Sequence, residues 1–391
     1  MKTLNRPQIN IGTILALLIG TLCLIAMITL YSASYYSAEN NFGDELYFVK
    51  KQGIAMIIGV VAAVGLRFVK IKHVKRAVYP LLILSFLLLG LIFIPSLGVE
   101  SYGARRWLNL GFFTIQPSEI SKFGLVLFSA KIIEKYDSDS LKGGLAILGV
   151  GLTMCVLLLL EPNMSVTVLT ATLMLCMLFA GGTKSKKFIY LLLPLLAGAV
   201  LLILVEPYRL QRLTAFIDPW KSPKGEGYQL IQSYYALGSG GWFGTGYLKG
   251  RQKYMFLPFA ESDFIFAIFA EEFGFVGGVG LIFLYLAIAT CGYKIAAKAT
   301  TRFESVLAYG ISSVIILQTL INVAVVSGSI PPTGIPLPFM SYGGSSLVCF
   351  MSSIGVLEAI NAKTRRSDYI IKGVEYGNRS FIDRRRKTAL R

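Results

Sequence analysis

Long apolar stretches separated by short polar segments dominate the chain. A helix that crosses a bilayer needs about 20 mainly apolar residues. Ten stretches approach that length: Ile11–Ala33, Gln52–Val69, Ala77–Pro95, Ser118–Ile133, Gly143–Leu160, Met164–Gly181, Phe188–Val205, Asp263–Cys291, Phe303–Ser327 and Met340–Ile360. The pattern predicts an all-α integral membrane protein, a polytopic bundle of about ten transmembrane helices with a long outer loop between spans seven and eight.

The composition agrees with lipid as the main solvent. The 391 residues are 54% hydrophobic and 15% charged, with a mean hydropathy of +0.64, whereas about 25% of a soluble domain is charged. We expect one membrane domain over residues 1–362 and a basic cytoplasmic tail over 363–391. The first stretch is longer than the roughly 7–15 apolar residues of a signal peptide, so we expect a retained anchor.

The lysines and arginines predict the orientation. With the N-terminus inside, the cytoplasmic segments hold 25 of the 38 Lys and Arg residues, and the outer loops hold 11, seven of them between Glu206 and Ser262. Basic residues favour the cytoplasmic side, so we expect both termini there. The net charge of +17 lies in short segments between apolar stretches, which argues against a nucleic-acid partner.

Cysteine and histidine chemistry is not expected. The five cysteines fall inside apolar stretches without CxxC or Cys/His spacing, so the sequence predicts neither a disulfide framework nor a zinc site. His73 is the only histidine and lies among four basic residues.

Polar residues gather in three outer segments, of which the first precedes the fourth span. It holds Arg105, Arg106, Trp107, Gln116, Pro117, Ser118 and Glu119, with Lys122 three residues further on. Pro117 suits the first turn of a helix, and Glu119 and Lys122 then share one face near its positive end. The spacing fits dipole compensation with a local ion pair. It also fits a polar cavity, because charges at the edge of an apolar span are costly elsewhere.

The second segment is the long loop before the eighth span. It holds Gln232 and Ser233, a glycine-rich run at 238–244, and Asp263, which stands where the loop meets the apolar helix. Asp263 is either an N-cap, a position that strongly favours aspartate, or a functional carboxylate. Glu271 and Glu272 follow, so either the hydrocarbon span begins near Phe273 or this helix lines a wet cavity.

The third segment, Pro331–Ser346, contains four prolines in eight residues and the polar run Ser341, Tyr342, Gly343 and Gly344. The prolines forbid a regular helix. Irregular backbone at membrane depth is tolerated only when it is buried in protein or lines a cavity. The segment is therefore either a cavity-lining element or a stiff outer loop.

Together these segments resemble the SEDS family of FtsW, RodA and SpoVE proteins. The resemblance rests on Ala-Arg-Arg-Trp and Gln-Pro-Ser-Glu-x-x-Lys at 104–122, Gln-Ser to Gly-Ser-Gly-Gly at 232–241, Asp-Phe-Ile-Phe-Ala at 263–267, and Gly-Ile-Pro-Leu-Pro-Phe-x-Ser-Tyr-Gly-Gly-Ser-Ser at 334–346. Members commonly carry Pro-Glu-x-His-Thr before the aspartate, where this chain has Pro258 to Ser262. Roles of that glutamate and histidine are therefore not carried over.

The resemblance implies a peptidoglycan glycosyltransferase that polymerises lipid II into glycan strands at the outer face of a bacterial cytoplasmic membrane, for cell division or sporulation. It implies a class B penicillin-binding protein, a transpeptidase, as the partner, together with other cell-wall and divisome membrane proteins. A lipid II flippase is the alternative. Transport sites tend to lie near the bilayer midplane between repeats, whereas these polar segments share one side.

The resemblance also assigns roles to residues. Asp263 matches the family's catalytic aspartate, and Lys122 is a further expected catalytic residue, a basic group on the same side that could face the pyrophosphate. Glu119, also expected to be catalytic, either orients Lys122, holds a metal or assists the base. The expected substrate-binding residues are Arg105, Arg106, Trp107, Gln232, Ser233, Ser341, Tyr342, Gly343 and Gly344. A departing pyrophosphate needs positive charge from Lys or Arg or from a divalent cation. The cofactor therefore stays open, with a divalent cation as the candidate and no metal ligand assigned.

Overall fold

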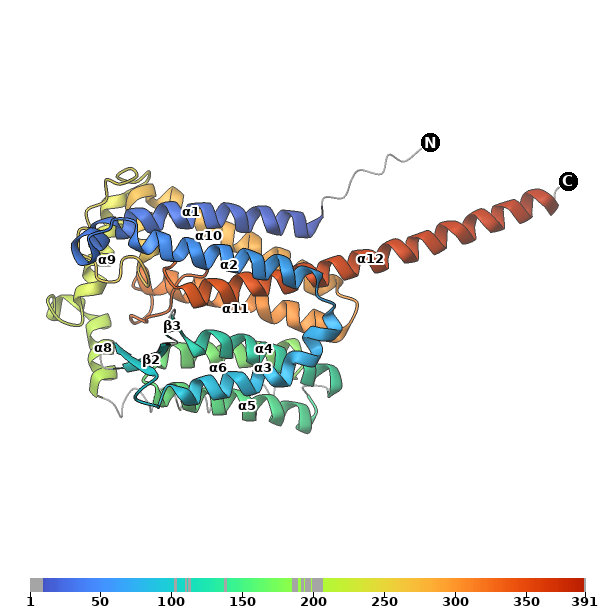
Figure 1. Ribbon diagram of the computed structural model, residues 1–391, viewed down its shortest axis with the longest axis horizontal. Helices are drawn as coiled ribbons and strands as arrows, with labels where there is room; N and C mark the ends of the chain where they lie inside the picture. The colour runs from blue at the N-terminus through green and yellow to red at the C-terminus, as the bar shows by residue number, and fades with distance from the viewer. Residues whose placement is uncertain are drawn as a thin grey trace.

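The computed structural model describes residues 10–101, 104–109, 111, 114–136, 139–184, 189–190, 193, 198 and 207–389. Long helices lie side by side with roughly parallel axes (Figure 1). They are α1 (Ile11–Phe42), α2 (Tyr47–Phe68), α3 (Ile71–Leu91), α4 (Pro117–Lys135), α5 (Leu141–Leu160), α6 (Met164–Ala180), α10 (Ile265–Lys298), α11 (Arg302–Val326) and α12 (Gly344–Ala389). These correspond to nine of the ten predicted spans. The seventh, Phe188–Val205, lies outside the described residues apart from isolated positions.

Seven of the described helices are long and apolar enough to cross a membrane: α1, α2, α3, α5, α10, α11, and α12 as far as Ser367. Helix α6 is apolar but has only 17 residues, and α4 carries five charged residues. The chain is thus an all-α polytopic membrane protein, as predicted, while the count of ten spans stays a prediction. The side chains beyond Ser367, and with them most of the predicted basic tail, lie outside the description.

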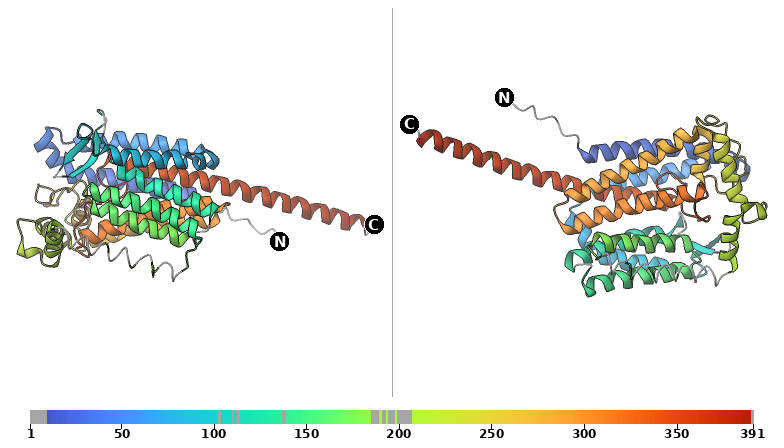
Figure 2. Two further views of the ribbon diagram at one scale, coloured as in Figure 1. Left: turned by 90° about the horizontal axis from the view of Figure 1, so that it is seen from below. Right: turned by 180° about the vertical axis from the view of Figure 1, so that it is seen from behind.

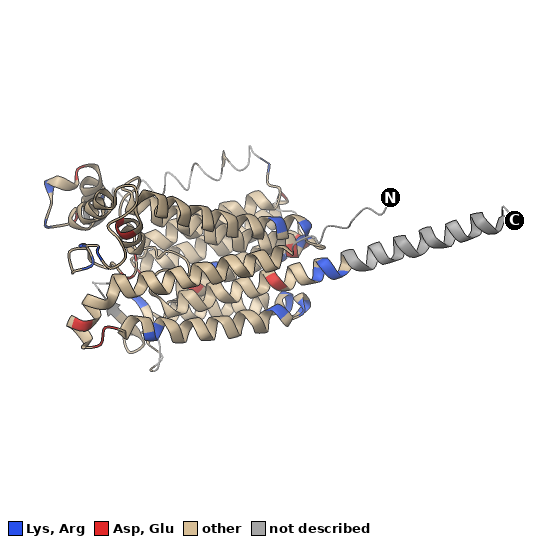
Figure 3. Cartoon of the chain, turned by 90° about the horizontal axis from the view of Figure 1, so that it is seen from above, with Lys and Arg blue, Asp and Glu red and all other residues tan. Residues whose placement is uncertain are grey.

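The two ends of the bundle differ. The start of α1 and the far end of α12 lie at one end, which we call the terminal end; α8, α9 and the strands lie at the other, which we call the loop end (Figures 1 and 2). Most charged residues lie near the two ends of the helices (Figure 3).

Secondary structure at the loop end exceeds what the sequence predicted. Three short strands, β1 (Gly98–Ser101), β2 (Ala104–Asn109) and β3 (Thr114–Ile115), form a small antiparallel sheet in the order β1-β2-β3. The long loop contains α8 (Pro207–Ile217), the 3₁₀ helix η1 (Pro219–Lys221) and α9 (Tyr228–Gly240). The apolar-stretch pattern did not reveal these elements, because they are short and polar.

Small residues bring α2 and α12 into close contact. A Cβ added at Gly59 of α2 would lie 3.0 Å from the side chain of Met351, and one added at Gly355 of α12 would lie 2.4 Å from the carbonyl oxygen of Ala63. In lipid, helices associate mainly through such packing, because lipid tails are as apolar as the side chains. The opposite face of α2 exposes Ile57, 67% accessible, as expected for a lipid-facing surface.

Helix α10 is broken at Gly274, where φ is 71° and ψ is −172°. The break leaves backbone groups without partners inside the helix, and the run after α9 supplies them. The Thr245 amide donates to the Glu271 carbonyl at 2.9 Å, and the Phe275 amide donates to the Gly241 carbonyl at 2.9 Å. A Cβ at Gly274 would lie 2.3 Å from the Gly244 nitrogen. The glycine-rich run is therefore a backbone partner for the broken helix.

A buried ion pair fixes the rest of this loop to the bundle. Lys253 Nζ lies 2.6 Å from Glu272 Oε1, and both side chains are fully buried. The Ser32 hydroxyl of α1 donates to the same carboxylate oxygen at 2.5 Å, and Lys253 donates to that hydroxyl at 3.0 Å. Glu271 accepts the Arg251 amide at 2.7 Å. Glu271 and Glu272 thus anchor the loop, and the two predicted settings, a hydrocarbon span that begins near Phe273 or a helix that lines a wet cavity, both stay predictions.

Replacing one partner of this pair tests the anchor. Lys253→Met leaves Glu272 buried without its counter-charge, which costs about 3–5 kcal/mol in unfolding free energy. The double variant Lys253→Met/Glu272→Leu should recover most of that loss. Thermal unfolding in detergent measures both, with exposed Lys249→Met from the same loop as the control. Equal unfolding temperatures for Lys253→Met and Lys249→Met would contradict the anchoring role.

Candidate active site

The first turn of α4 carries a buried ion pair at the loop end. Lys122 Nζ lies 2.8 Å from Glu119 Oε1, and each side chain is 1% exposed. Pro117 opens the helix and the Glu119 amide donates to the Gln116 carbonyl at 3.0 Å, so the turn forms as the sequence predicts. The predicted local ion pair is therefore present, and it lies inside the protein.

The pair extends to two other helices. The Ser346 hydroxyl of α12 donates to the second Glu119 oxygen at 2.8 Å, and Lys122 donates to Gln318 Oε1 of α11 at 2.6 Å. A buried pair is tolerated only when further hydrogen bonds satisfy both charges. The ring of Phe350 lies 5.6 Å from Lys122 Nζ, within the range of a cation–π contact. Glu119 and Lys122 thus link α4, α11 and α12 at one point.

The irregular segment before α12 is held by side chains rather than by regular structure. Gln318 Nε2 donates to the Pro336 carbonyl at 2.8 Å, Asn322 Nδ2 to the Ile335 carbonyl at 2.8 Å, and the Tyr285 hydroxyl to the Pro338 carbonyl at 2.5 Å. The apolar residues of the segment, Ile335, Leu337, Phe339 and Met340, are buried. The segment is therefore packed into the bundle and is not a stiff outer loop; that it lines a cavity stays a prediction.

Asp263 does not cap the helix that follows it. Helix α10 begins at Ile265, and its N-cap is Phe264, which makes no side-chain capping bond. The Asp263 carbonyl accepts Asn322 Nδ2 at 2.8 Å, so the side chain that holds Ile335 also holds Asp263. A Cβ at Gly334 would lie 3.1 Å from Asp263 Oδ2. Because Gly334 has no side chain, the Asp263 carboxylate can pack directly against the third segment.

The surroundings raise the pKa of Asp263, which lies outside the membrane-spanning helices. Burial of the carboxyl and the nearby Glu261 raise its pKa from 3.8 to about 7, although Arg106 and Arg212 act in the opposite direction. The residue keeps some accessible surface, while the carboxyl itself is surrounded by protein. A carboxylate whose pKa is near neutrality can accept a proton at physiological pH.

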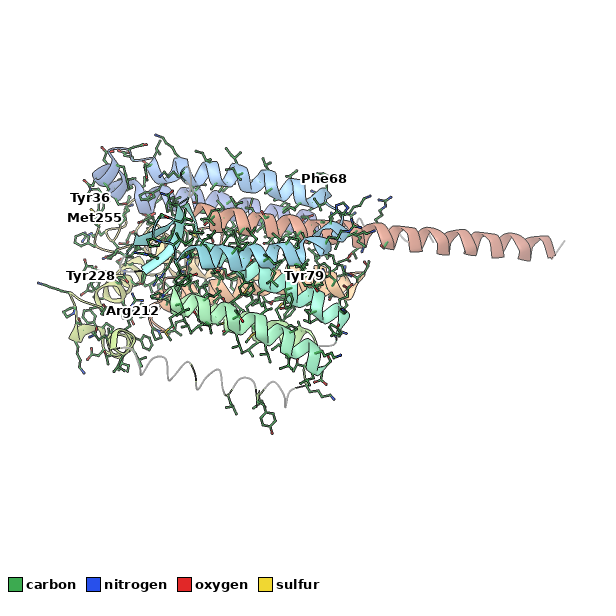
Figure 4. The ribbon with its side chains drawn as sticks, turned by 60° about the horizontal axis from the view of Figure 1, so that its bottom comes forward. Tyr36, Phe68, Tyr79, Arg212, Tyr228 and Met255 are labelled. Carbon is green, nitrogen blue, oxygen red and sulfur yellow. The ribbon has the colours of Figure 1, made fainter. Side chains whose placement is uncertain are left out.

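Two arginines near Asp263 come from distant parts of the chain. Arg106 lies on β2, and its Nη2 donates to the Pro162 carbonyl at 2.6 Å. Arg212 lies on α8 at the loop end (Figure 4), where its Nη1 donates to the Pro332 carbonyl at 3.5 Å and its Nε lies 3.6 Å from Glu226. The sequence singled out Arg106 but not Arg212, because α8 was not predicted.

The other predicted substrate-binding residues are placed as follows. On β2, Arg105 pairs with Glu100 and Trp107 with Val99. Gln232 of α9 is half-buried, and the Ser233 hydroxyl donates to the Val326 carbonyl at 2.7 Å.

The polar run before α12 bonds mainly to the segment that carries Asp263. The Ser341 hydroxyl donates to the Ser262 carbonyl at 2.6 Å, and the Tyr342 amide donates to the Glu261 carbonyl at 2.9 Å. The Gly343 amide donates to Gln52 Oε1 at 3.1 Å. Gly344 begins α12. The 341–343 run therefore positions the Glu261–Asp263 segment, and its contact with substrate stays a prediction.

The residues that hold the site together were missed from the sequence. Gln318 and Asn322 are four residues apart on one face of α11, and buried Gln52 of α2 bonds to Ser341 and Gly343 of the third segment. Buried amides at helical spacing within an apolar stretch were the available signal.

Within the described residues, no group of three or more His, Cys, Asp and Glu side chains could hold a metal ion. Arg106 and Arg212, whose charges act on Asp263, carry guanidinium groups of the kind that bind phosphate oxygens.

Fold and site together define a class: polytopic membrane proteins whose helical bundle presents a carboxylate and basic side chains at one end. The model of the Cell cycle protein family, FtsW/RodA/SpoVE, matches residues 13–366. The chain therefore belongs to the SEDS family, as its motifs predicted.

Similar proteins agree with this assignment. The chain is 38% identical to Stage V sporulation protein E of Bacillus subtilis (strain 168), over 90% of this chain and 97% of that protein. It is also 38% identical to the probable peptidoglycan glycosyltransferase FtsW of Geobacter sp. (strain M18), over 87% and 93%.

Solved structures share the fold. One, described as "Structural coordination of polymerization and crosslinking by a peptidoglycan synthase complex", has a TM-score of 0.74 and 28% identity, over 90% of this chain and 97% of that chain. The rod shape determining protein RodA of Thermus thermophilus has a TM-score of 0.66 and 26% identity, over 90% and 96%.

Proposed function

We propose that this chain is a peptidoglycan glycosyltransferase that polymerises lipid II into glycan strands, for cell division or sporulation. The observation that carries the proposal is Asp263. Its carboxylate does not cap a helix, its backbone is held by Asn322, and its pKa is raised to about 7. Family membership and the names of the relatives supply the substrate class.

The proposed reaction is a glycosyl transfer in which a carboxylate and two arginines have different roles. The Asp263 carboxylate removes the proton from the hydroxyl of the acceptor sugar. The hydroxyl oxygen bonds to the anomeric carbon of the donor as the bond from that carbon to the lipid pyrophosphate breaks. Arg106 and Arg212, whose charges already act on Asp263, would stabilise the pyrophosphate that leaves.

Glu119 and Lys122 are assigned a supporting part in this proposal. Their charges are satisfied by each other and by Gln318 and Ser346, so neither is poised as a free base. The pair instead fixes α4 against α11 through Gln318. One turn further along α11, Asn322 positions Asp263. A flippase is disfavoured, since the polar groups lie at one end of the bundle and not near its middle.

Asp263→Asn tests the proposal. Because Asp263 makes no capping bond, the amide should leave folding and thermal unfolding unchanged, while glycan synthesis from lipid II by the purified protein falls about 10²–10⁴-fold, since an amide cannot take up the proton. Asp218→Asn, at an exposed aspartate of the same end, is the matched control and should keep its activity. Polymerisation by Asp263→Asn at the wild-type rate would overturn the assignment.

The proposed orientation places the loop end outside and both termini in the cytoplasm. Its support is the excess of basic residues in the segments at the terminal end. In a background without native cysteines, Lys224→Cys at the loop end should react with an impermeant maleimide in intact cells. Lys72→Cys, exposed at the opposite end, should react only after permeabilisation. The reverse labelling pattern would invert the topology.

We also propose a single-pass class B penicillin-binding protein as the partner, together with other cell-wall membrane proteins. The solved structure with the TM-score of 0.74 is described as a peptidoglycan synthase complex. The loop anchored by Lys253 and Glu272 gives such a partner a fixed surface beside the site. Co-purification of the full chain with its native membrane neighbours would identify the partner.

A further inference from the structure

The connection between α5 and α6 contains two buried polar side chains that the proposed reaction does not use. Glu161 is 1% exposed and Asn163 is 4% exposed. Within the part of the chain that the structure describes, neither carboxylate oxygen of Glu161 has a hydrogen-bond partner, and neither does Asn163 Nδ2. Buried polar groups are almost always hydrogen-bonded, and an exception needs an explanation.

The geometry of the turn places Glu161 beside the site. The Glu161 amide donates to the Leu157 carbonyl at 3.1 Å and the Asn163 amide to the Leu158 carbonyl at 3.0 Å, so the connection is a tight continuation of α5. Between these residues the Pro162 carbonyl accepts Nη2 of Arg106 at 2.6 Å. Arg106 is therefore tied to the same turn that carries Glu161.

Arg106 acts on two carboxyl groups at once. Its charge lowers the pKa of Glu161 and also that of Asp263. It is the one charged group that acts on Glu161 among the described residues. A buried carboxyl without hydrogen bonds is far more stable neutral than charged. Once ionised, it would be stabilised chiefly by drawing the guanidinium toward itself.

We propose that Glu161 is a positioning residue that acts through Arg106: its neutral carboxyl leaves the guanidinium where its charge acts on Asp263, and its ionised form draws the guanidinium away. The inference rests on the proposed function, because the position of Arg106 matters through the pyrophosphate that it would stabilise. Glu161 touches neither the sugar nor the pyrophosphate in this account.

The pH at which Glu161 changes form follows from its surroundings. Burial raises its pKa from 4.5 to about 8, against the opposing charge of Arg106. Glu161 is thus neutral below that pH and ionises as the pH rises through it. Asp263, whose pKa is about 7, must be deprotonated to act as the base. The two groups together predict a bell-shaped dependence of kcat/KM on pH.

The experiment compares pH profiles of glycan synthesis from lipid II by the purified full chain. Above pH 8, wild-type kcat/KM should fall about tenfold per pH unit, as expected for loss of one essential proton. Glu161→Gln, which keeps the shape of the neutral carboxyl, should remove this alkaline limb and leave the acid limb in place. Glu45→Gln, at an exposed carboxylate of the same end, should keep both limbs.

A double variant tests the route through Arg106, and two outcomes would contradict the inference or the function on which it rests. In an Arg106→Gln background, Glu161→Gln should change nothing, because the route through Arg106 is gone. If Glu161→Gln does not fold, Glu161→Met, which fills the site without a charge, is scored in the same way. An alkaline limb that persists in the folded variant overturns the inference while the proposed function stands. Failure of wild type to make polymer at any pH removes the proposed function itself.

Discussion

An irregular stretch of backbone, residues 331–343, packs against buried helices. The placement of Asp263 and of the Glu119–Lys122 pair depends on the side chains that hydrogen-bond to the polar backbone groups of this stretch. In a bilayer such groups cannot turn to water, and each unsatisfied one costs several kcal/mol. Amides and a hydroxyl from α2, α10 and α11 supply the partners, and Asn322 does so for Ile335 and Asp263 together. The hydrogen bond that permits the irregular segment is thus the same one that fixes the carboxylate.

The electrostatics of the site follow from this arrangement. Gln318, one turn from Asn322, accepts a hydrogen bond from Lys122 through its Oε1 and donates one to the Pro336 carbonyl through its Nε2. The charge pair of α4 and the segment before α12 are therefore held by the same side chain. Asp263 is left without a cation in direct contact among the described residues, and Arg106 and Arg212 reach its neighbourhood from β2 and α8. Burial consequently outweighs the arginines, which leaves its pKa near neutrality.

Apolar stretches and motif spacing predicted the helices and the residues with the strongest charges. The ion pair of Glu119 and Lys122 follows from helical spacing, and the irregular segment follows from its prolines. The N-cap alternative for Asp263 was wrong, because α10 begins two residues later, and only coordinates could show that. Arg212, Gln318 and Glu161 were missed for a common reason. The surroundings of each come from a segment far away in sequence, and a lone polar residue in one stretch does not reveal its neighbours.

The proposed mechanism requires Asp263 to be a carboxylate that can take up a proton near neutral pH. A direct titration of this group in the full chain tests it, by infrared or carbon-13 NMR difference spectra against Asp263→Asn. We expect a midpoint at about 7 in the wild type. The midpoint should be higher in Arg212→Gln, because a nearby positive charge favours the ionised form. A wild-type midpoint near the ordinary value of 3.8, unmoved by the loss of Arg212, would contradict it.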